Sequence, residues 1–96
     1  PGATWKLQRE VTAGDLERAE TVLVDPPRTG LDPAALELVA RTGGRIVYVS
    51  CDPQTLGRDV ARLPGFEVTA VAALDLMPQT FHVESVVTLR PLKLGA

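Results

Sequence analysis

Short apolar runs alternate with turns rich in proline, glycine and aspartate along most of the chain. Residues 21–25 and 45–50 are two such runs, apolar at consecutive positions and rich in β-branched side chains. A strand that is apolar on both of its faces is typical of a parallel sheet covered by helices. The pattern therefore predicts two buried strands.

Each predicted strand is followed by the pattern of an amphipathic helix. Asp32 can cap a helix whose first residue is Pro33, and Asp52 can cap a helix that begins at Pro53. Both helices then carry apolar residues at helical spacing, which are Leu36, Val39 and Ala40 in the first and Leu56, Val60 and Leu63 in the second. The chain thus alternates strand, helix, strand, helix.

Two further strands are predicted after the second helix. Residues 66–74 form one of them, in which Glu67 and Thr69 make one face partly polar, as in an edge strand. Residues 83–90 form the other, and the link between them is too short for a helical crossover, so the two should be antiparallel neighbours. Residues 1–20 show no assignable element. The predicted fold is therefore an α/β domain over residues 21–90, with two strand–helix units followed by an antiparallel hairpin.

The composition narrows the class of protein. The 96 residues carry a formal net charge of −2, which argues against a self-sufficient nucleic-acid-binding domain with a basic surface. No apolar run reaches the ~20 residues of a membrane span, and the first ten residues lack the apolar core of a signal peptide. We therefore expect a cytoplasmic protein, of which this chain forms one domain or part of one.

The predicted topology brings chemically active residues to one place. In a parallel sheet with right-handed crossovers, the carboxyl ends of the strands meet at one edge, where ligands normally bind. Asp25 and Cys51 stand at the ends of the first two predicted strands. The antiparallel last strand begins at the same edge and brings His82 and Glu84 with it. Four polar groups from three distant segments are therefore expected to converge.

The single cysteine has two interpretations. One cysteine cannot form an intrachain disulfide, and with one histidine it gives no metal-ligand cluster. The free N–H groups of the helix start directly after Cys51 would favour its thiolate, as in a catalytic nucleophile. A packing role stays open, because free cysteines are among the most buried residues in proteins.

The other candidates also have a functional and a structural interpretation. Glu84 suits a general base, because an apolar strand start favours proton uptake by a carboxylate, but it also suits a solvent-facing position. His82 shares the strand face of Glu84 and could bind a substrate or make a structural hydrogen bond. Residues 25–28, an aspartate, two prolines and Arg28, form a rigid turn, in which Arg28 could hold a phosphate or simply be solvated.

Three blocks of sequence taken together resemble one family. They are Asp25-Pro26-Pro27-Arg28; Val49-Ser50-Cys51-Asp52-Pro53 with Thr55-Leu56 and Arg58-Asp59; and Asp75 with Pro78-Gln79-Thr80 and His82-Val83-Glu84. In order and rough spacing the blocks resemble the RNA uracil-C5 methyltransferases, which use S-adenosylmethionine. The resemblance runs from about Val22 to Leu89. It implies the C-terminal half of a class I, Rossmann-like methyltransferase sheet.

The resemblance also implies a covalent mechanism. The cysteine matching Cys51 adds to C6 of the target uracil, which makes C5 nucleophilic enough to take the methyl group. The glutamate matching Glu84 then removes the C5 proton, and the aspartate matching Asp25 lies by the cofactor or the target base. The target uridine, in ribosomal or transfer RNA, would be flipped out or single-stranded.

This chain departs from the family pattern in one respect, because no glycine-rich loop follows a strand. The family builds its cofactor pocket mainly from earlier strands that include such a loop. The resemblance therefore implies an incomplete S-adenosylmethionine pocket, and we expect this chain to be inactive alone. An exposed sheet edge should make it dimerise or aggregate. Two other functions stay open, which are methylation of cytosine or an exocyclic amine, and a non-enzymatic α/β binding module.

Overall fold

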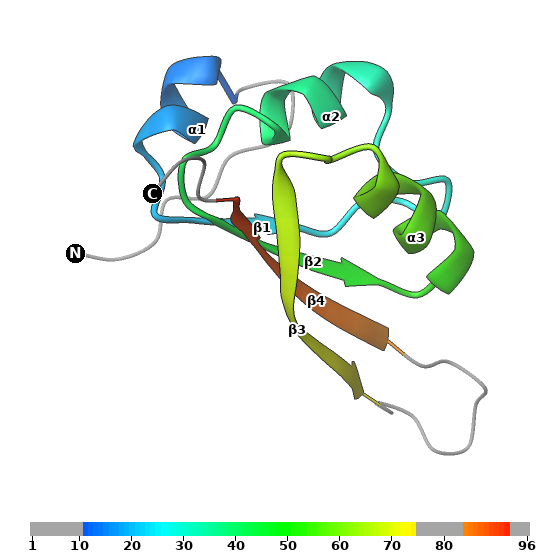
Figure 1. Ribbon diagram of the computed structural model, residues 1–96. Helices are drawn as coiled ribbons and strands as arrows, with labels where there is room; N and C mark the ends of the chain where they lie inside the picture. The colour runs from blue at the N-terminus through cyan, green and yellow to red at the C-terminus, as the bar shows by residue number, and fades with distance from the viewer. Residues whose placement is uncertain (1–10, 75–83, 93–96) are drawn as a thin grey trace.

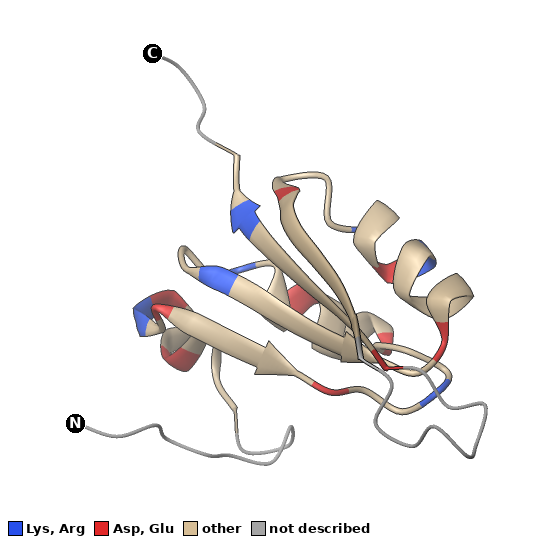
Figure 2. Ribbon diagram, turned by 90° about the horizontal axis from the view of Figure 1, so that it is seen from below, with Lys and Arg blue, Asp and Glu red and all other residues tan. Residues whose placement is uncertain are grey.

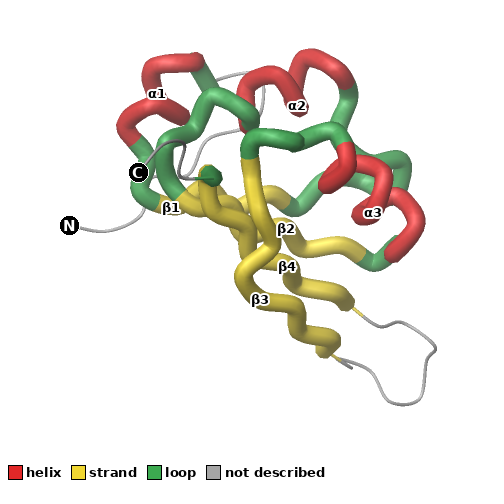
Figure 3. The backbone as a smooth tube through the Cα atoms, in the orientation of Figure 1, coloured by secondary structure: helices red, strands yellow, loops and turns green. Residues whose placement is uncertain are grey.

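A computed structural model of the chain describes residues 11–74 and 84–92, which form a mixed sheet with helices on one of its faces (Figures 1 and 3). In chain order the elements are α1 (Ala13–Arg18), β1 (Thr21–Val24), α2 (Pro33–Val39), β2 (Arg45–Ser50), α3 (Pro53–Ala61), β3 (Phe66–Leu74) and β4 (Glu84–Pro91). Both predicted strand–helix units and the antiparallel hairpin are confirmed. Each strand lies within one residue of its predicted bounds.

The strands lie in the order β1-β2-β4-β3. β1 pairs with β2 in parallel, whereas β4 is antiparallel to both β2 and β3. β4 is thus inserted between two earlier strands, and β3 is left at the edge, as its partly polar face predicts. The carboxyl ends of β1 and β2 and the start of β4 consequently meet at one end of the sheet, which we call the site edge.

Aspartate caps determine where α2 and α3 begin. The carboxylate of Asp32 accepts the backbone N–H of Ala35 at 2.7 Å. The carboxylate of Asp52 accepts the N–H groups of Gln54 and Thr55 at 3.0 and 3.2 Å. These bonds satisfy backbone donors that the first turn of a helix leaves without an intrahelical partner, so both predicted caps are confirmed.

The helix α1 was not predicted. Its start is a capping box, in which Thr12 accepts the N–H of Asp15 at 3.2 Å and Asp15 accepts the N–H of Thr12 at 2.9 Å. The threonine and the acidic residue three positions later were visible in the sequence. Gly14 inside a helix of only six residues concealed the pattern, because glycine disfavours a helix interior.

The hydrophobic core fills the space between the sheet and the helices. Its members are Val24, Leu31, Ala35, Leu36, Val39, Ile46, Tyr48, Leu56, Leu63, Val87 and Leu89. The predicted apolar stripes of α2 and α3 therefore face the sheet, except that Ala40 is exposed because α2 ends one residue earlier. The core gives the site edge a fixed support, since both β2 and β4 contribute fully buried side chains.

The opposite face of the sheet has no helix over it in the described part of the chain (Figure 3). Strand alternation assigns Leu23, Val47, Val49 and Val86 to this face, and Leu23 is 51% exposed. The strands were predicted to be covered on both faces, and in the described residues only one face is covered. Within residues 11–74 and 84–92, no helix is long and apolar enough to cross a membrane.

Candidate functional site

The sheet register brings three of the four candidate residues to the site edge. Asp25 directly follows β1, Cys51 directly follows β2, and Glu84 begins β4. The last pair between β2 and β4 is Ser50 with Ser85. Cys51 lies one residue beyond this pair on one strand and Glu84 one residue beyond it on the other, so three of the four predicted groups meet at this edge. His82, the fourth candidate, lies outside the described residues.

The chemical groups at the site edge are accessible. Cys51 and Asp25 are exposed and Glu84 is half-buried. Glu84 is in phase with Val86, on the face opposite to the helices, whereas Ser50 is buried on the helix side. Among the described residues the Cys51 thiol is therefore accessible from outside, which does not favour the packing interpretation.

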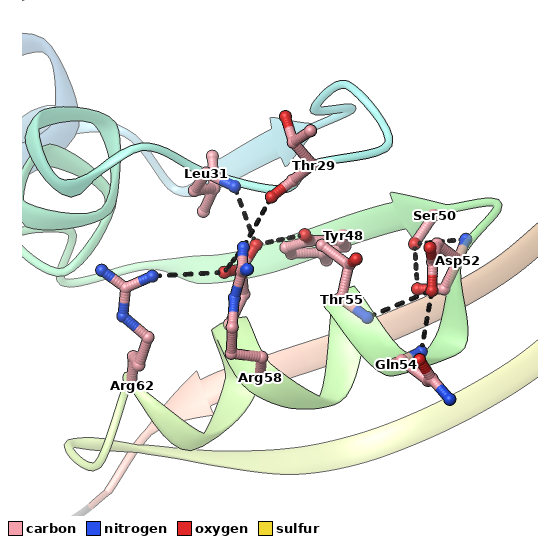
Figure 4. Close-up of polar contacts among 10 residues, drawn as sticks. Thr29, Leu31, Tyr48, Ser50, Asp52, Gln54, Thr55, Arg58 and Arg62 are labelled. Carbon is pink, nitrogen blue, oxygen red and sulfur yellow. Dashed lines mark hydrogen bonds and ion pairs between the residues drawn. The ribbon is translucent and has the colours of Figure 1, made fainter.

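A tight turn holds Cys51 at the end of β2. The Ser50 hydroxyl donates to the carbonyl of Asp52 at 2.9 Å and accepts the N–H of Asp52 at 3.0 Å. The helix N–H groups that were expected to act on Cys51 instead donate to the Asp52 carboxylate (Figure 4). Cys51 is thus positioned by the Ser50–Asp52 turn, and the prediction that it uses the free donors of α3 is wrong.

The segment after β1 is a rigid turn that packs on α3. We call residues 25–31 the aspartate turn. The N–H of Gly30 donates to the carbonyl of Pro27 at 2.8 Å, and Gly30 has a φ of 86°. This left-handed conformation favours glycine, and two prolines restrict the preceding backbone. Asp25 therefore stands at the start of a turn with little conformational freedom.

Asp59 is a buried acid that the sequence analysis quoted in a motif but gave no role. It is 0% exposed, and its Oδ2 accepts the Tyr48 hydroxyl at 2.5 Å and the Leu31 N–H at 2.9 Å. The guanidinium groups of Arg58 and Arg62 lie 3.5 and 3.8 Å from Oδ1 (Figure 4). Burial raises the pKa of Tyr48, and the hydrogen bond to Asp59 raises it further.

The position of Asp59 in the sequence did indicate that its side chain is buried. It stands three residues after Leu56 and four before Leu63, on the apolar stripe of its helix. A charged residue on such a stripe is buried only with partners, because an unpaired buried charge is strongly disfavoured. The partners come from β2 and from the aspartate turn, and their spacing in the sequence gives no indication of the contact.

The charges around the site edge are mostly negative (Figure 2). Asp25, Asp52 and Glu84 all lie there, and Arg28 is exposed on the aspartate turn. Arg45 and Arg90 are neighbours at the opposite end of the sheet, next to the Ile46–Leu89 pair. The described part of the chain therefore presents no broad basic surface around Cys51, in agreement with its overall charge.

A pocket of about 290 Å³ lies beside the aspartate turn, between β1 and α2. Asp25, Pro26 and Pro27 line it together with apolar side chains from both elements. Two aspartates, Asp25 and the α2 cap Asp32, line it beside an apolar wall. It is bordered by β1, whose outer edge pairs with no described strand. These residues fit one side of a site for a cofactor such as S-adenosylmethionine.

Comparisons with known proteins agree with this geometry. A family model described as tRNA (Uracil-5-)-methyltransferase matches residues 7–91. An uncharacterized RNA methyltransferase of Thermotoga maritima is 48% identical over 75 residues, and one of Gloeobacter violaceus is 51% identical over 75 residues. The solved structure of the Pyrococcus abyssi tRNA (uracil-54, C5)-methyltransferase in complex with S-adenosyl-L-homocysteine matches with a TM-score of 0.73 and 42% identity.

These matches cover most of this chain and a small part of each relative. The aligned region is 75% of this chain in both curated relatives, and 17% and 16% of their own lengths. For the Pyrococcus abyssi structure the shares are 88% of this chain and 21% of that one. The chain is therefore similar to one segment of each of these relatives, which are much longer proteins.

Proposed function

Because this chain belongs to the tRNA (uracil-5-)-methyltransferase family, we propose that it is the C-terminal catalytic part of an enzyme that methylates C5 of uridine in RNA. The observation that carries the proposal is the meeting of the exposed Cys51 with Glu84 on the neighbouring strand. Uracil C5 is a poor nucleophile until a group adds to C6. A thiol that adds to C6 and a carboxylate that removes the C5 proton are therefore the two groups that this reaction requires.

Cys51 acts first in the proposed mechanism. Its sulfur, as the thiolate, forms a bond to C6 of the uracil, and the electrons of the C5–C6 double bond move toward C5 and the O4 carbonyl. S-adenosylmethionine, when bound, supplies the methyl group that C5 takes up. The Ser50–Asp52 turn keeps the sulfur at the end of β2, so the reacting atoms can be held close before the bond forms.

Glu84 completes the reaction. Its carboxylate takes the proton from C5, the electron pair restores the C5–C6 double bond, and the bond from C6 to Cys51 breaks to release the thiolate. Asp25 lies by the cofactor or the target base in this scheme, and Arg28 and His82 contact the RNA. The uridine must be flipped out or single-stranded to reach Cys51.

Covalent trapping tests the proposal. We call the longer protein of which this chain is a part the complete enzyme. It should form a lasting adduct with RNA that contains 5-fluorouridine, because the base can remove a proton from C5 but cannot remove fluorine as a cation, so the thiolate is not released. The adduct should appear as a slowly migrating band on a denaturing gel, with ribosomal or transfer RNA as substrate. RNA with ordinary uridine is the control, and failure to trap the analogue while methylating RNA would contradict the covalent mechanism.

Product analysis separates this function from methylation of cytosine or an exocyclic amine. Digestion of the methylated RNA and mass spectrometry of the nucleosides should yield 5-methyluridine. Recovery of a methylated cytidine or an N-methylated base would instead support the alternative reaction.

The 96-residue chain alone should bind S-adenosylmethionine weakly or not at all. Of the two aspartates that line the pocket beside the aspartate turn, Asp32 already caps α2, and no described strand pairs with the outer edge of β1. Isothermal titration calorimetry of the chain against S-adenosylhomocysteine checks this prediction, with the complete enzyme as the positive control. Micromolar binding by the chain alone would contradict it.

A further inference from the structure

The aspartate turn is fastened to α3 by side chains from the middle of that helix. The Arg58 guanidinium donates to the Thr29 carbonyl at 2.6 Å, and Asp59 accepts the Leu31 N–H at 2.9 Å (Figure 4). The two bonds flank Gly30 on either side. They join residues that are 28 and 29 positions apart in the sequence, so no local turn preference accounts for them.

Packing at Gly30 makes the contact close as well as hydrogen-bonded. A Cβ atom at this position would lie 2.5 Å from Thr55 Cγ2, 2.6 Å from Arg58 Nη2 and 2.7 Å from Asp59 Oδ2. The backbone of the turn therefore rests directly on one side of α3. A turn that packs this tightly has a single position relative to the helix.

The buried carboxylate at this contact is held by several donors. Asp59 receives the Tyr48 hydroxyl from β2 and the Leu31 N–H from the turn, and its other oxygen faces Arg58 and Arg62. A buried carboxylate needs such partners, and they link β2, α3 and the aspartate turn at one point.

The same helix also holds Cys51. Asp52 caps α3, and its backbone is bonded to the Ser50 hydroxyl. Cys51 lies between these two bonded residues. The last residues of the aspartate turn, Thr29 to Leu31, and the cysteine turn are therefore both attached to α3.

We propose that Arg58 and Asp59 are positioning residues, which fix the aspartate turn against the Cys51 turn so that Asp25 and the thiol face the same substrate. This inference rests on the proposed uracil-C5 methyltransferase function. Neither residue needs to touch the substrate, because Asp59 is fully buried and Arg58 donates to a backbone carbonyl.

Arg58→Ala and Arg62→Ala are a matched pair of variants in the complete enzyme. Both remove an arginine near the Asp59 carboxylate, and both side chains are partly exposed, at 52% and 38%. Only Arg58 bonds to the aspartate turn. We expect Arg58→Ala to slow adduct formation about 10- to 100-fold at saturating RNA and cofactor, as misplacement of reacting groups does, and Arg62→Ala to leave the rate nearly unchanged.

Two further readouts separate positioning from other roles. The KM for RNA and its dependence on salt should stay the same in Arg58→Ala, whereas an arginine that bound RNA phosphate would change both. Arg58→Lys, which keeps a donor within reach of the Thr29 carbonyl, should restore part of the rate. Thermal denaturation of both variants should show that each is folded at the assay temperature, so that a loss of rate in Arg58→Ala does not reflect unfolding.

The outcomes also distinguish this inference from the function on which it rests. If the unmodified complete enzyme neither forms the adduct nor methylates uridine, the proposed function is wrong. If the unmodified enzyme is active and Arg58→Ala is as fast as Arg62→Ala, or if its loss lies in KM alone, the positioning role is wrong.

Discussion

Replacing Cys51 by alanine in the complete enzyme is expected to abolish methyl transfer and adduct formation together, with a loss of at least about 10³-fold. The expectation follows from the proposed covalent step, since no other described thiol is available at the site edge.

Glu84→Gln is expected to behave differently. Cys51 can still add to C6 and C5 can still take the methyl group, but the C5 proton stays and the sulfur is not released, so a covalent complex should accumulate on ordinary uridine RNA.

A denaturing gel and a methyl-transfer assay distinguish the two variants. Glu67→Gln is the matched carboxylate control, because Glu67 lies at the opposite end of the sheet, paired with Arg90, and should keep normal activity. An adduct formed by Cys51→Ala would show that the nucleophile is another residue. Normal turnover by Glu84→Gln would assign the proton transfer elsewhere.

Replacing Gly30 by alanine should destabilise the protein by about 2–4 kcal/mol, from a left-handed backbone strain of about 1–2 kcal/mol together with displacement of a buried hydrogen bond. The added methyl group would meet Thr55, Arg58 and Asp59 at distances below 3.0 Å. The buried Asp59 carboxylate cannot move aside without losing the Tyr48 hydroxyl or the Leu31 N–H. Urea denaturation followed by circular dichroism measures the change.

Gly57→Ala is the matched control for this substitution. Gly57 lies inside α3 with open space where its Cβ would stand, and Gly30 alone has a positive φ among the described glycines. Alanine there should stabilise the protein by roughly 0.5–1 kcal/mol because it favours the helix. Equal effects of the two substitutions would show that the aspartate turn does not pack on α3 as described.

The elements that depend on local patterns could be predicted from the sequence. β2 and β3 match their predicted bounds, and the aspartate caps at Asp32 and Asp52 start their helices where expected. These features depend on residues a few positions apart, which alternation and capping preferences describe well. The meeting of Asp25, Cys51 and Glu84 was also predictable, because strand direction alone determines which ends share an edge.

The features that depend on distant contacts could not be predicted. The hairpin of β3 and β4 was expected, but its pattern does not say which of the two pairs with β2. The roles of Arg58 and Asp59 depend on a turn about 30 residues earlier in the chain. The expected use of helix donors by Cys51 failed because a nearer carboxylate, that of Asp52, accepts them.

The central position of β4 also determines the order in which the sheet can form. Among the described strands β3 pairs with β4 alone, so it is connected to β1 and β2 only through β4. During synthesis β3, with its exposed Val68 and Val71, leaves the ribosome before its partner, which makes it prone to aggregate for that interval. Cys51 and Glu84 come together only when β4 pairs with β2, a contact between segments that are distant in the sequence.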